Sequence, residues 1–285
     1  MSEKVMSLKG KVKCDENYDD KEKDDIGLSL EKLNLGPRKK LIVLGLGGLL
    51  CQRIYRNNTS EIPRSRRPDA AYGNNLVFLR PHCKDFIKFC LKRFEVGIWS
   101  SAKEYNVDST LECIMKGLKS KLLFAWGQEK CTDTGFGSLE KKDKPLFLKE
   151  LKKVWQNNNA LLPRCKGQFG PLNTLQMDDK PYKALLNPVH NAIFPYPYKI
   201  EDTKDDAFGP KSELRMYLEK LVDAKDVPSF VKEHTYGQAA VTPSHSNGNT
   251  IPGLQSTNDD IMMKRWKVLN DRKWEKSQSK KDRTV

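Results

Sequence analysis

Four short apolar runs, each followed by glycine or polar residues, constrain the fold of this sequence more than any other feature. They cover residues 41–44, 96–99, 122–126 and 173–177. Runs of four or five apolar residues are typical of strands in a parallel sheet, because helices cover both faces of such a sheet and bury every side chain. The sequence therefore predicts a buried parallel sheet.

Segments with helical spacing separate these runs. Apolar residues recur every three or four positions in residues 83–94, 107–118 and 146–155. Strands that alternate with helices predict an α/β fold, a doubly wound parallel sheet with helices on both faces. After the fourth run, the pattern predicts an edge strand at residues 192–194 and terminal helices at 214–222 and 227–232.

The predicted domain organisation follows from changes in composition. Residues 1–37 are rich in Lys, Asp and Glu and are expected to be a disordered polar segment. Residues 38–236 are expected to form a single folded domain, for which 38% hydrophobic residues in the chain are sufficient. Residues 237–260 have the Ser, Asn, Gly and Pro content of a flexible linker, and residues 261–285 form a basic tail.

Charge and cysteine content narrow the class of protein. The net charge of +14 favours acidic partners such as nucleic acid, phosphopeptides or anionic membrane surfaces. Seven scattered cysteines without a C-x-x-C pair argue against a disulfide framework and against a zinc site. We find no apolar stretch of the roughly 18 residues that a membrane span requires, and no signal or transit peptide. The expected location is the nucleus or cytosol.

Candidate site residues follow the apolar runs, because ligands bind outside the carboxyl ends of the strands in open α/β sheets. The residues after the first, second and fourth runs are Gly45-Leu46-Gly47-Gly48, Ser100-Ser101 and Asp178-Asp179. A further candidate, Lys142-Asp143-Lys144, lies in the long polar segment between the third and fourth runs.

The order of these motifs resembles the haloacid dehalogenase superfamily. Five stretches carry the resemblance to its branch of RNA polymerase II C-terminal-domain phosphatases, the NLI-interacting-factor-like branch, and most closely to its plant type. They are Lys39-Lys40-Leu41-Ile42-Val43-Leu44, Leu79-Arg80-Pro81, Trp99-Ser100-Ser101, Cys131-Thr132-Asp133 and Asp178-Asp179-Lys180-Pro181-Tyr182. The resemblance spans residues 38 to about 236 and implies a protein serine/threonine phosphatase, a phosphoric monoester hydrolase that uses Mg²⁺.

The resemblance also implies roles for single residues. In the family the first strand ends in Asp-x-Asp, where the first aspartate attacks phosphorus and the second transfers protons. This sequence has Gly45 and Gly47 at these positions, and glycine can supply neither group. The other implied roles are phosphoryl hydrogen bonding by Ser100, charge neutralisation by Lys144 (Lys142 if the alignment shifts), and Mg²⁺ binding by Asp178 and Asp179.

These departures predict a catalytically impaired phosphatase-like protein that binds a phosphorylated or acidic protein partner. Gly127, where the plant relatives are expected to have an acidic residue, is a third departure. One alternative is an active Mg²⁺-dependent phosphatase that uses another carboxylate, although residues 38–58 contain none. A second alternative is a subunit like the receptor of the mitochondrial import translocase, against which the missing transit peptide and membrane span argue.

Several residues keep two interpretations. Ser100 and Ser101 also suit a helix cap, Asp178-Asp179 an ordinary turn, and Lys142 and Lys144 a solvated surface. A basic loop could contact a substrate or only keep the chain soluble; its arginines are Arg53, Arg56, Arg64, Arg66 and Arg67. The basic tail, with Trp266 and Trp274, could bind nucleic acid or be a disordered end.

Overall fold

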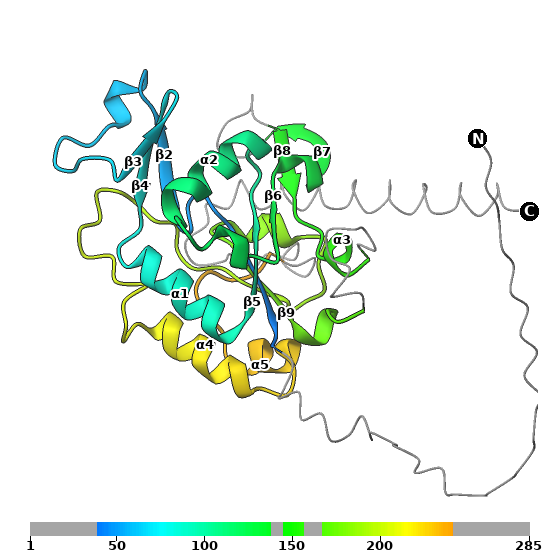
Figure 1. The fold of residues 1–285 in the computed structure, drawn as a ribbon. Coiled ribbons are helices and arrows are strands. Elements are labelled where there is room, and N and C mark those ends of the chain that lie inside the picture. Colours follow the sequence, from blue (N-terminus) through cyan, green and yellow to red (C-terminus); the bar gives the residue numbers. More distant parts are fainter. Residues whose placement is uncertain (1–38, 138–144, 157–166, 242–285) are drawn as a thin grey trace, which may run out of the picture. The chain divides into compact units, whose positions relative to one another are not determined.

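A five-stranded parallel sheet forms the centre of the protein (Figure 1). The structure, a computed structural model, describes residues 39–137, 145–156 and 167–241. The strand order is β10-β9-β1-β5-β6, and every neighbouring pair is parallel. The strands are β1 (Leu41–Leu44), β5 (Glu95–Trp99), β6 (Phe124–Trp126), β9 (Thr174–Met177) and β10 (Ala192–Ile193). The predicted α/β class, the four runs and the edge strand are confirmed.

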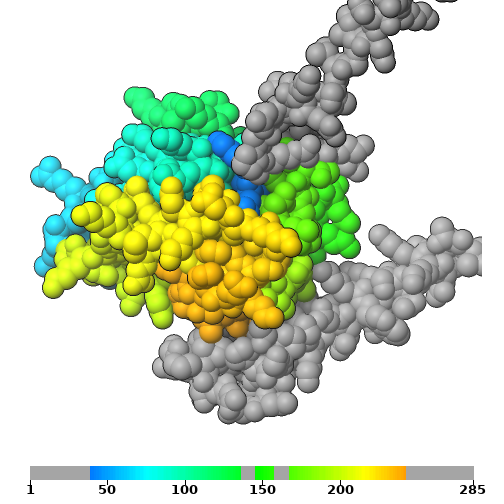
Figure 2. Space-filling view, turned by 90° about the horizontal axis from the view of Figure 1, so that it is seen from below, coloured from blue at the N-terminus to red at the C-terminus, as the bar shows by residue number. Residues whose placement is uncertain are grey.

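Helices flank this sheet. The four longer helices share a core with Ile42 and Leu44, and the short α3 packs with Leu41 and Val43 on the other face. Figure 2 shows the C-terminal helices, yellow to orange, beside the cyan segment that contains α1. The helices are α1 (Cys83–Arg93), α2 (Glu104–Ile114), α3 (Lys152–Trp155), α4 (Glu213–Asp223) and α5 (Val227–Glu233).

Strand β1 determines where a ligand can bind. It is fully buried and pairs with β5 on one side and with β9 on the other. The chain builds the sheet outward from β1 through β5 to β6 and then returns to add β9 on the opposite side. The order of strands therefore reverses at β1 and β9, and in α/β sheets the binding crevice lies outside the carboxyl ends of the strands at such a point.

One predicted helix is wrong. Residues 146–155 do not form a single helix, because the first part is strand β8 (Pro145–Leu148), which pairs antiparallel with β7 (Thr132–Gly137). Leu146 and Leu148 are buried on one face of β8, where Tyr182 and Leu185 pack against them. Only the last turn, α3, is helical. Leu146 and Leu148 alternate as expected for a strand, but this short pattern also fits the helical spacing of apolar residues over 146–155, which led to the wrong prediction.

The predicted basic loop after the first motif is partly a sheet. Strands β2 (Cys51–Tyr55), β4 (Asn75–Leu79) and β3 (Ala70–Tyr72) form an antiparallel sheet in that order. Arg53 lies on β2, and its guanidinium donates to the Tyr72 hydroxyl at 3.3 Å. Short 3₁₀ helices are η2 (Thr59–Glu61), η3 (Lys119–Lys121), η4 (Gln128–Lys130), η6 (Pro171–Asn173) and η7 (Pro181–Ala184).

The two predicted terminal helices are confirmed as α4 and α5, and each begins at a side-chain cap. The Ser212 hydroxyl accepts a hydrogen bond from the Arg215 backbone, and the Asp226 carboxylate accepts one from Ser229. Among the described residues, no helix is long and apolar enough to cross a membrane. The predicted N-terminal segment, the basic tail and the linker beyond residue 241 lie outside the described residues.

Candidate active site

The glycines of the first motif lie directly after β1, beside the acidic pair that follows β9. The Gly45 backbone donates to the carbonyl of Met177 at 2.8 Å. A Cβ atom on Gly45 would lie 3.2 Å from the Asp178 carboxylate, whereas one on Gly47 would have no heavy atom within 4 Å. The structure therefore brings the first and last predicted motifs together, with open space at Gly47.

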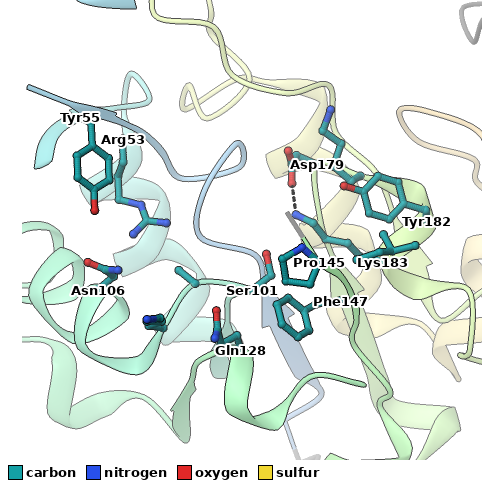
Figure 3. A pocket seen from close by; sticks show the side chains of 14 residues that line it. Arg53, Tyr55, Ser101, Asn106, Gln128, Pro145, Phe147, Asp179, Tyr182 and Lys183 are labelled. Carbon is teal, nitrogen blue, oxygen red and sulfur yellow. Dashed lines mark hydrogen bonds and ion pairs between the residues drawn. The ribbon is translucent and has the colours of Figure 1, made fainter. Parts of the chain in front are cut away.

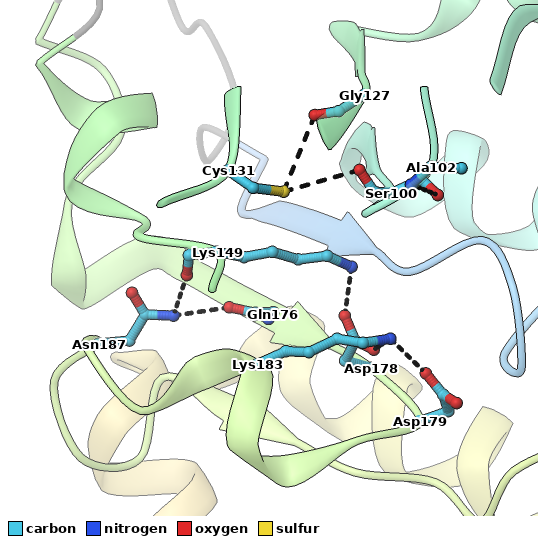
Figure 4. A network of polar contacts seen from close by, with 10 residues as sticks. All are labelled: Ser100, Ala102, Gly127, Cys131, Lys149, Gln176, Asp178, Asp179, Lys183 and Asn187. Carbon is cyan, nitrogen blue, oxygen red and sulfur yellow. Dashed lines mark hydrogen bonds and ion pairs between the residues drawn. The ribbon is translucent and has the colours of Figure 1, made fainter. Parts of the chain in front are cut away.

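Two lysines converge on Asp178 and Asp179 (Figure 4). Both acids are buried, with 0% and 5% of their surface exposed. Lys149, directly after β8, donates from Nζ to Oδ2 of Asp178. Lys183, on η7, places Nζ 2.9 Å from Oδ1 of Asp178 and 2.8 Å from Oδ1 of Asp179. Two carboxylates and two ammonium groups thus form one buried cluster, which we call the Asp–Lys cluster.

The pKa values of the two aspartates shift in opposite directions, because Asp178 contacts two lysines and Asp179 contacts one. Burial opposes ionisation of Asp178, but Lys149 and Lys183 outweigh it and hold the pKa of Asp178 below its ordinary value. Asp179 has one ammonium partner and lies beside the Asp178 charge. Burial and that neighbouring charge, against the attraction of Lys183, raise the pKa of Asp179 to about 6.

The lysines respond in opposite directions. Burial lowers the pKa of Lys149, which the Asp178 charge only partly offsets. Burial acts in the same sense on Lys183, but its two carboxylate partners prevail and raise the pKa of Lys183 well above its ordinary value. Of the two lysines, Lys183 therefore keeps its positive charge more strongly than Lys149 does.

The sequence reasoning missed both lysines. The predicted Lys144 and its alternative Lys142 lie outside the described residues, so their phosphate role stays a prediction. A signal for Lys149 was available, since it follows the apolar run of β8 as the other candidates follow their strands. A signal for Lys183 was its position four residues after Asp179, a spacing that brings opposite charges together on a helical turn.

Ser100 is buried at the end of β5, as predicted for a site residue. Its hydroxyl accepts a hydrogen bond from the Ala102 backbone at 3.2 Å, so it caps the turn that leads to α2. The thiol of Cys131 lies 3.7 Å from the Ser100 carbonyl and 3.8 Å from the Gly127 carbonyl. The role of Ser100 in phosphoryl binding stays a prediction.

Gly127 leaves room for a nearby acid. A Cβ atom at Gly127 would lie 2.3 Å from a carboxylate oxygen of Glu129. The other Glu129 oxygen accepts a hydrogen bond from the Glu104 backbone at 3.2 Å, at the first turn of α2. An acidic side chain two residues away therefore occupies the space beside Gly127 and serves the helix N-terminus.

A cavity of about 550 Å³ opens beside the Asp–Lys cluster. In Figure 3, Arg53 and Tyr55 of β2 lie across the opening from Asp179, Tyr182 and Lys183. Ser101, rather than Ser100, lines it. We call this cavity the cationic pocket, since the charged residues that line it, among those the structure describes, are Arg53, Lys103, Lys180, Lys183 and Asp179.

The residues at this site do not fit a magnesium ion as they are arranged. Mg²⁺ requires several oxygen ligands in near-octahedral geometry. Here Asp178 and Asp179 are already bonded to ammonium groups, and Gly45 and Gly47 after β1 have no side-chain oxygen. Among the described residues, no group of three or more His, Cys, Asp or Glu side chains could hold a metal ion.

Comparisons with known proteins agree with this architecture. The family model described as "NLI interacting factor-like phosphatase" matches residues 40–228. An uncharacterized FCP1 homology domain-containing protein of Schizosaccharomyces pombe is 28% identical over 196 residues, which are 67% of this chain and 73% of that protein.

Two solved structures are also similar. The structure of Fcp1, described as an essential RNA polymerase II CTD phosphatase, has a TM-score of 0.37 and 15% identity over 82% of this chain. The fission yeast Fcp1 bound to beryllium fluoride has a TM-score of 0.37 and 14% identity over 87% of this chain. The chain spans 62% and 66% of the lengths of these two proteins, less than two thirds of each.

Proposed function

Because this chain belongs to the NLI interacting factor-like phosphatase family, we propose that it uses a phosphatase domain to bind a phosphorylated or acidic protein segment without hydrolysing it. One observation carries the proposal. Gly45 and Gly47 follow β1, where the resemblance to the family implies the attacking and proton-transferring aspartates, and they offer no side-chain oxygen, while the cationic pocket opens beside Asp179.

The chemistry of the remaining carboxylates supports binding over hydrolysis. A substitute nucleophile needs a free, ionised oxygen that can reach phosphorus. The oxygens of Asp178 are engaged by Lys149 and Lys183, and Asp179 shares the second of these lysines. Glu129 is engaged at the start of α2. Among these described carboxylates, Asp178 has both oxygens engaged and would have to lose one of these interactions before it could attack.

The charge of the cationic pocket supports an anionic ligand. Among the described lining residues, Arg53, Lys103, Lys180 and Lys183 are positive, and the carboxylate of Asp179 is paired with Lys183. A phosphoryl group carries nearly two negative charges at neutral pH and accepts charge-assisted hydrogen bonds from such groups. The net charge of +14 adds long-range attraction that salt would screen.

The walls of the cationic pocket support a peptide as the carrier of that charge. Tyr55, Phe147 and Tyr182 line it together with Pro145. Aromatic side chains offer large contact surfaces for the apolar or proline-containing residues of a bound segment. Tyr55 on β2 is 54% exposed, so the surface is accessible from solvent at that edge.

Calorimetric titration with a matched pair of serine peptides, one phosphorylated and one not, tests the proposal. The phosphorylated peptide should bind more tightly, and added salt should weaken it. Arg53→Ala and Lys103→Ala should each weaken it roughly tenfold, about 1.4 kcal/mol. Lys92→Ala is the matched control, since Lys92 is exposed on α1, near the amino ends of the strands, and should change nothing.

A phosphate-release assay separates this proposal from the active enzyme. The chain should release no inorganic phosphate from the same peptide or from para-nitrophenyl phosphate with Mg²⁺ present. Turnover above background would favour an active Mg²⁺-dependent phosphatase instead. Equal affinity for the two peptides at millimolar concentration would contradict the phosphate-binding proposal itself.

A further inference from the structure

A single ammonium group bridges the two buried carboxylates that were predicted to hold Mg²⁺. The Lys183 nitrogen lies 2.9 Å from Asp178 and 2.8 Å from Asp179, and its side chain is only 12% exposed. Adjacent carboxylates repel one another, and burial increases the repulsion. A cation between them is therefore required for both to be ionised.

The backbone holds Lys183 in this position. It lies on η7, which begins at Pro181, two residues after Asp179. The carbonyl of Lys183 accepts a hydrogen bond from the Lys149 backbone at 2.9 Å, so the two lysines of the Asp–Lys cluster are fixed relative to each other. Gln238 donates to the Asp179 carbonyl at 2.9 Å and fixes the acid from the other side.

The charge balance leaves no place for a divalent cation. Two ammonium groups already neutralise two carboxylates in a buried cluster. A metal ion would add two positive charges to that neutral set, and a protonated lysine donates hydrogen bonds but cannot be a metal ligand. Lys183 and a metal ion would therefore compete for the same two oxygens.

We propose that Lys183 is a built-in replacement for the divalent cation at Asp178 and Asp179, and that it excludes Mg²⁺ from this position. Folding is then independent of divalent metal, and removal of the lysine charge converts the acid pair into a metal site. This inference concerns the acid pair and goes beyond the proposed peptide-binding function.

Divalent-cation binding to the full chain tests the inference, with Mn²⁺ as a spectroscopic substitute for Mg²⁺. Electron paramagnetic resonance measures free Mn²⁺, and thermal unfolding is followed in chelator and in millimolar Mg²⁺. The unmodified chain should bind no Mn²⁺ at this site, and its Tm should be the same in both buffers. Lys183→Met should lower the Tm in chelator, bind one Mn²⁺ per chain, and regain stability with Mg²⁺.

Two further variants complete the test. Lys103→Met removes one positive charge from the cationic pocket at the start of α2 but leaves the ion pairs of Asp178 and Asp179 with Lys149 and Lys183 in place, so it should bind no Mn²⁺. Lys183→Arg keeps the charge and should behave like the unmodified chain even if Lys183→Met does not fold. The inference is overturned if the unmodified chain or Lys183→Arg takes up one Mn²⁺ at this site, or if folded Lys183→Met takes up none.

Discussion

A Cβ atom on Gly48 would lie 2.1 Å from Oδ2 of Asp179. Gly48 has a φ of +78°, which side chains of L-residues rarely adopt. The turn after β1 and the acid after β9 are thus packed together with no space for a methyl group. Glycine at this position is required by structure, whereas Gly47 has open space around it.

Gly48→Ala should lower the free energy of unfolding strongly. The positive φ alone costs an alanine about 1–2 kcal/mol. Displacement of Asp179 from Lys183 adds to this, so we expect a total loss of about 3 kcal/mol or more. Urea denaturation measures the change.

Gly117→Ala is the control for this variant. Gly117 has a φ of +75° but no heavy atom within 4 Å of its Cβ position. It should lose only the conformational cost of about 1–2 kcal/mol. Equal losses in the two variants would contradict the packing of Gly48 against Asp179.

Restoration of the two aspartates should have unequal effects on stability. Gly47→Asp places its side chain in open space and should change the free energy of unfolding by less than about 0.5 kcal/mol. Gly45→Asp brings its Cβ atom to 3.2 Å from the Asp178 carboxylate, and such crowding should destabilise by about 1–3 kcal/mol. Denaturation of the two single variants distinguishes the positions.

The double variant, Gly45→Asp with Gly47→Asp, tests whether the rest of the site can support hydrolysis. It should release phosphate from para-nitrophenyl phosphate only if the Asp–Lys cluster rearranges to admit Mg²⁺. If Lys183 excludes Mg²⁺, the double variant should stay inactive. A triple variant that also carries Lys183→Met should then hydrolyse the substrate only when Mg²⁺ is present. Activity in the double variant alone would show that Lys183 does not exclude the metal.

Removal of Lys149 should destabilise the fold more than removal of an exposed lysine. Its side chain is 1% exposed and its partner Asp178 is fully buried. Loss of one member of a buried ion pair typically costs about 3–5 kcal/mol. Without Lys149, Lys183 is left as the ammonium partner of both Asp178 and Asp179, so the cluster carries one uncompensated negative charge. Lys149→Met should therefore approach that loss in urea denaturation.

The controls for Lys149 use an exposed pair and a double variant. Lys88 pairs with Asp85 at 3.7 Å on the surface of α1, and Lys88→Met should cost less than about 1 kcal/mol. Lys149→Met combined with Asp178→Asn should recover part of the stability, because Lys183 and Asp179 then remain as a balanced pair. A double variant as unstable as the sum of its parts would argue against the pairing.

The sheet and the acid pair could be predicted from the sequence for a physical reason. A strand buried on both faces is mainly apolar, so its carboxyl end is marked where the apolar run gives way to glycine or polar residues, although β9 also buries Thr174 and Gln176. That rule located Ser100 and Asp178 correctly at the ends of β5 and β9. The glycines after β1 were located in the same way.

The rule failed for strands outside the central sheet. In β2, Gln52 and Arg53 are half-buried among apolar neighbours, so the strand does not form an apolar run. One signal was present nevertheless, since Gly73-Asn74 forms the two-residue connection between β3 and β4 that is typical of hairpins. The hydrogen bond of Arg53 to Tyr72 depends on this pairing and could not be foreseen without it.

The pairing of Lys149 with Asp178 could not be predicted, because these two residues meet only through tertiary contacts. Lys149 precedes Asp178 by 29 positions, and although it follows an apolar run, nothing in a chain with many lysines selects it as the partner of Asp178. Its selection depends on the β7–β8 hairpin, which directs residue 149 toward the end of β9. Where an ion pair depends on the approach of two separate elements, sequence spacing carries little information.

Asp179 should make the stability of the metal-free protein depend on pH between about pH 4 and pH 6. Its pKa is raised from 3.8 to about 6, so in this range the folded state binds more protons than the unfolded state. Stability from this group is complete below the unfolded pKa and is lost as the pH rises through the folded pKa. Asp178, with its lowered pKa, acts in the opposite direction but below about pH 4.

Asp179→Asn should remove this dependence, since asparagine does not titrate. The other titrating groups are common to both proteins, so the difference between their unfolding free energies isolates Asp179. Measured by urea denaturation in chelator, the unmodified chain should lose on the order of 2 kcal/mol relative to Asp179→Asn between pH 4 and pH 7. A constant difference across this range would mean that Asp179 is ionised throughout, and that one lysine suffices to hold both carboxylates in their charged form.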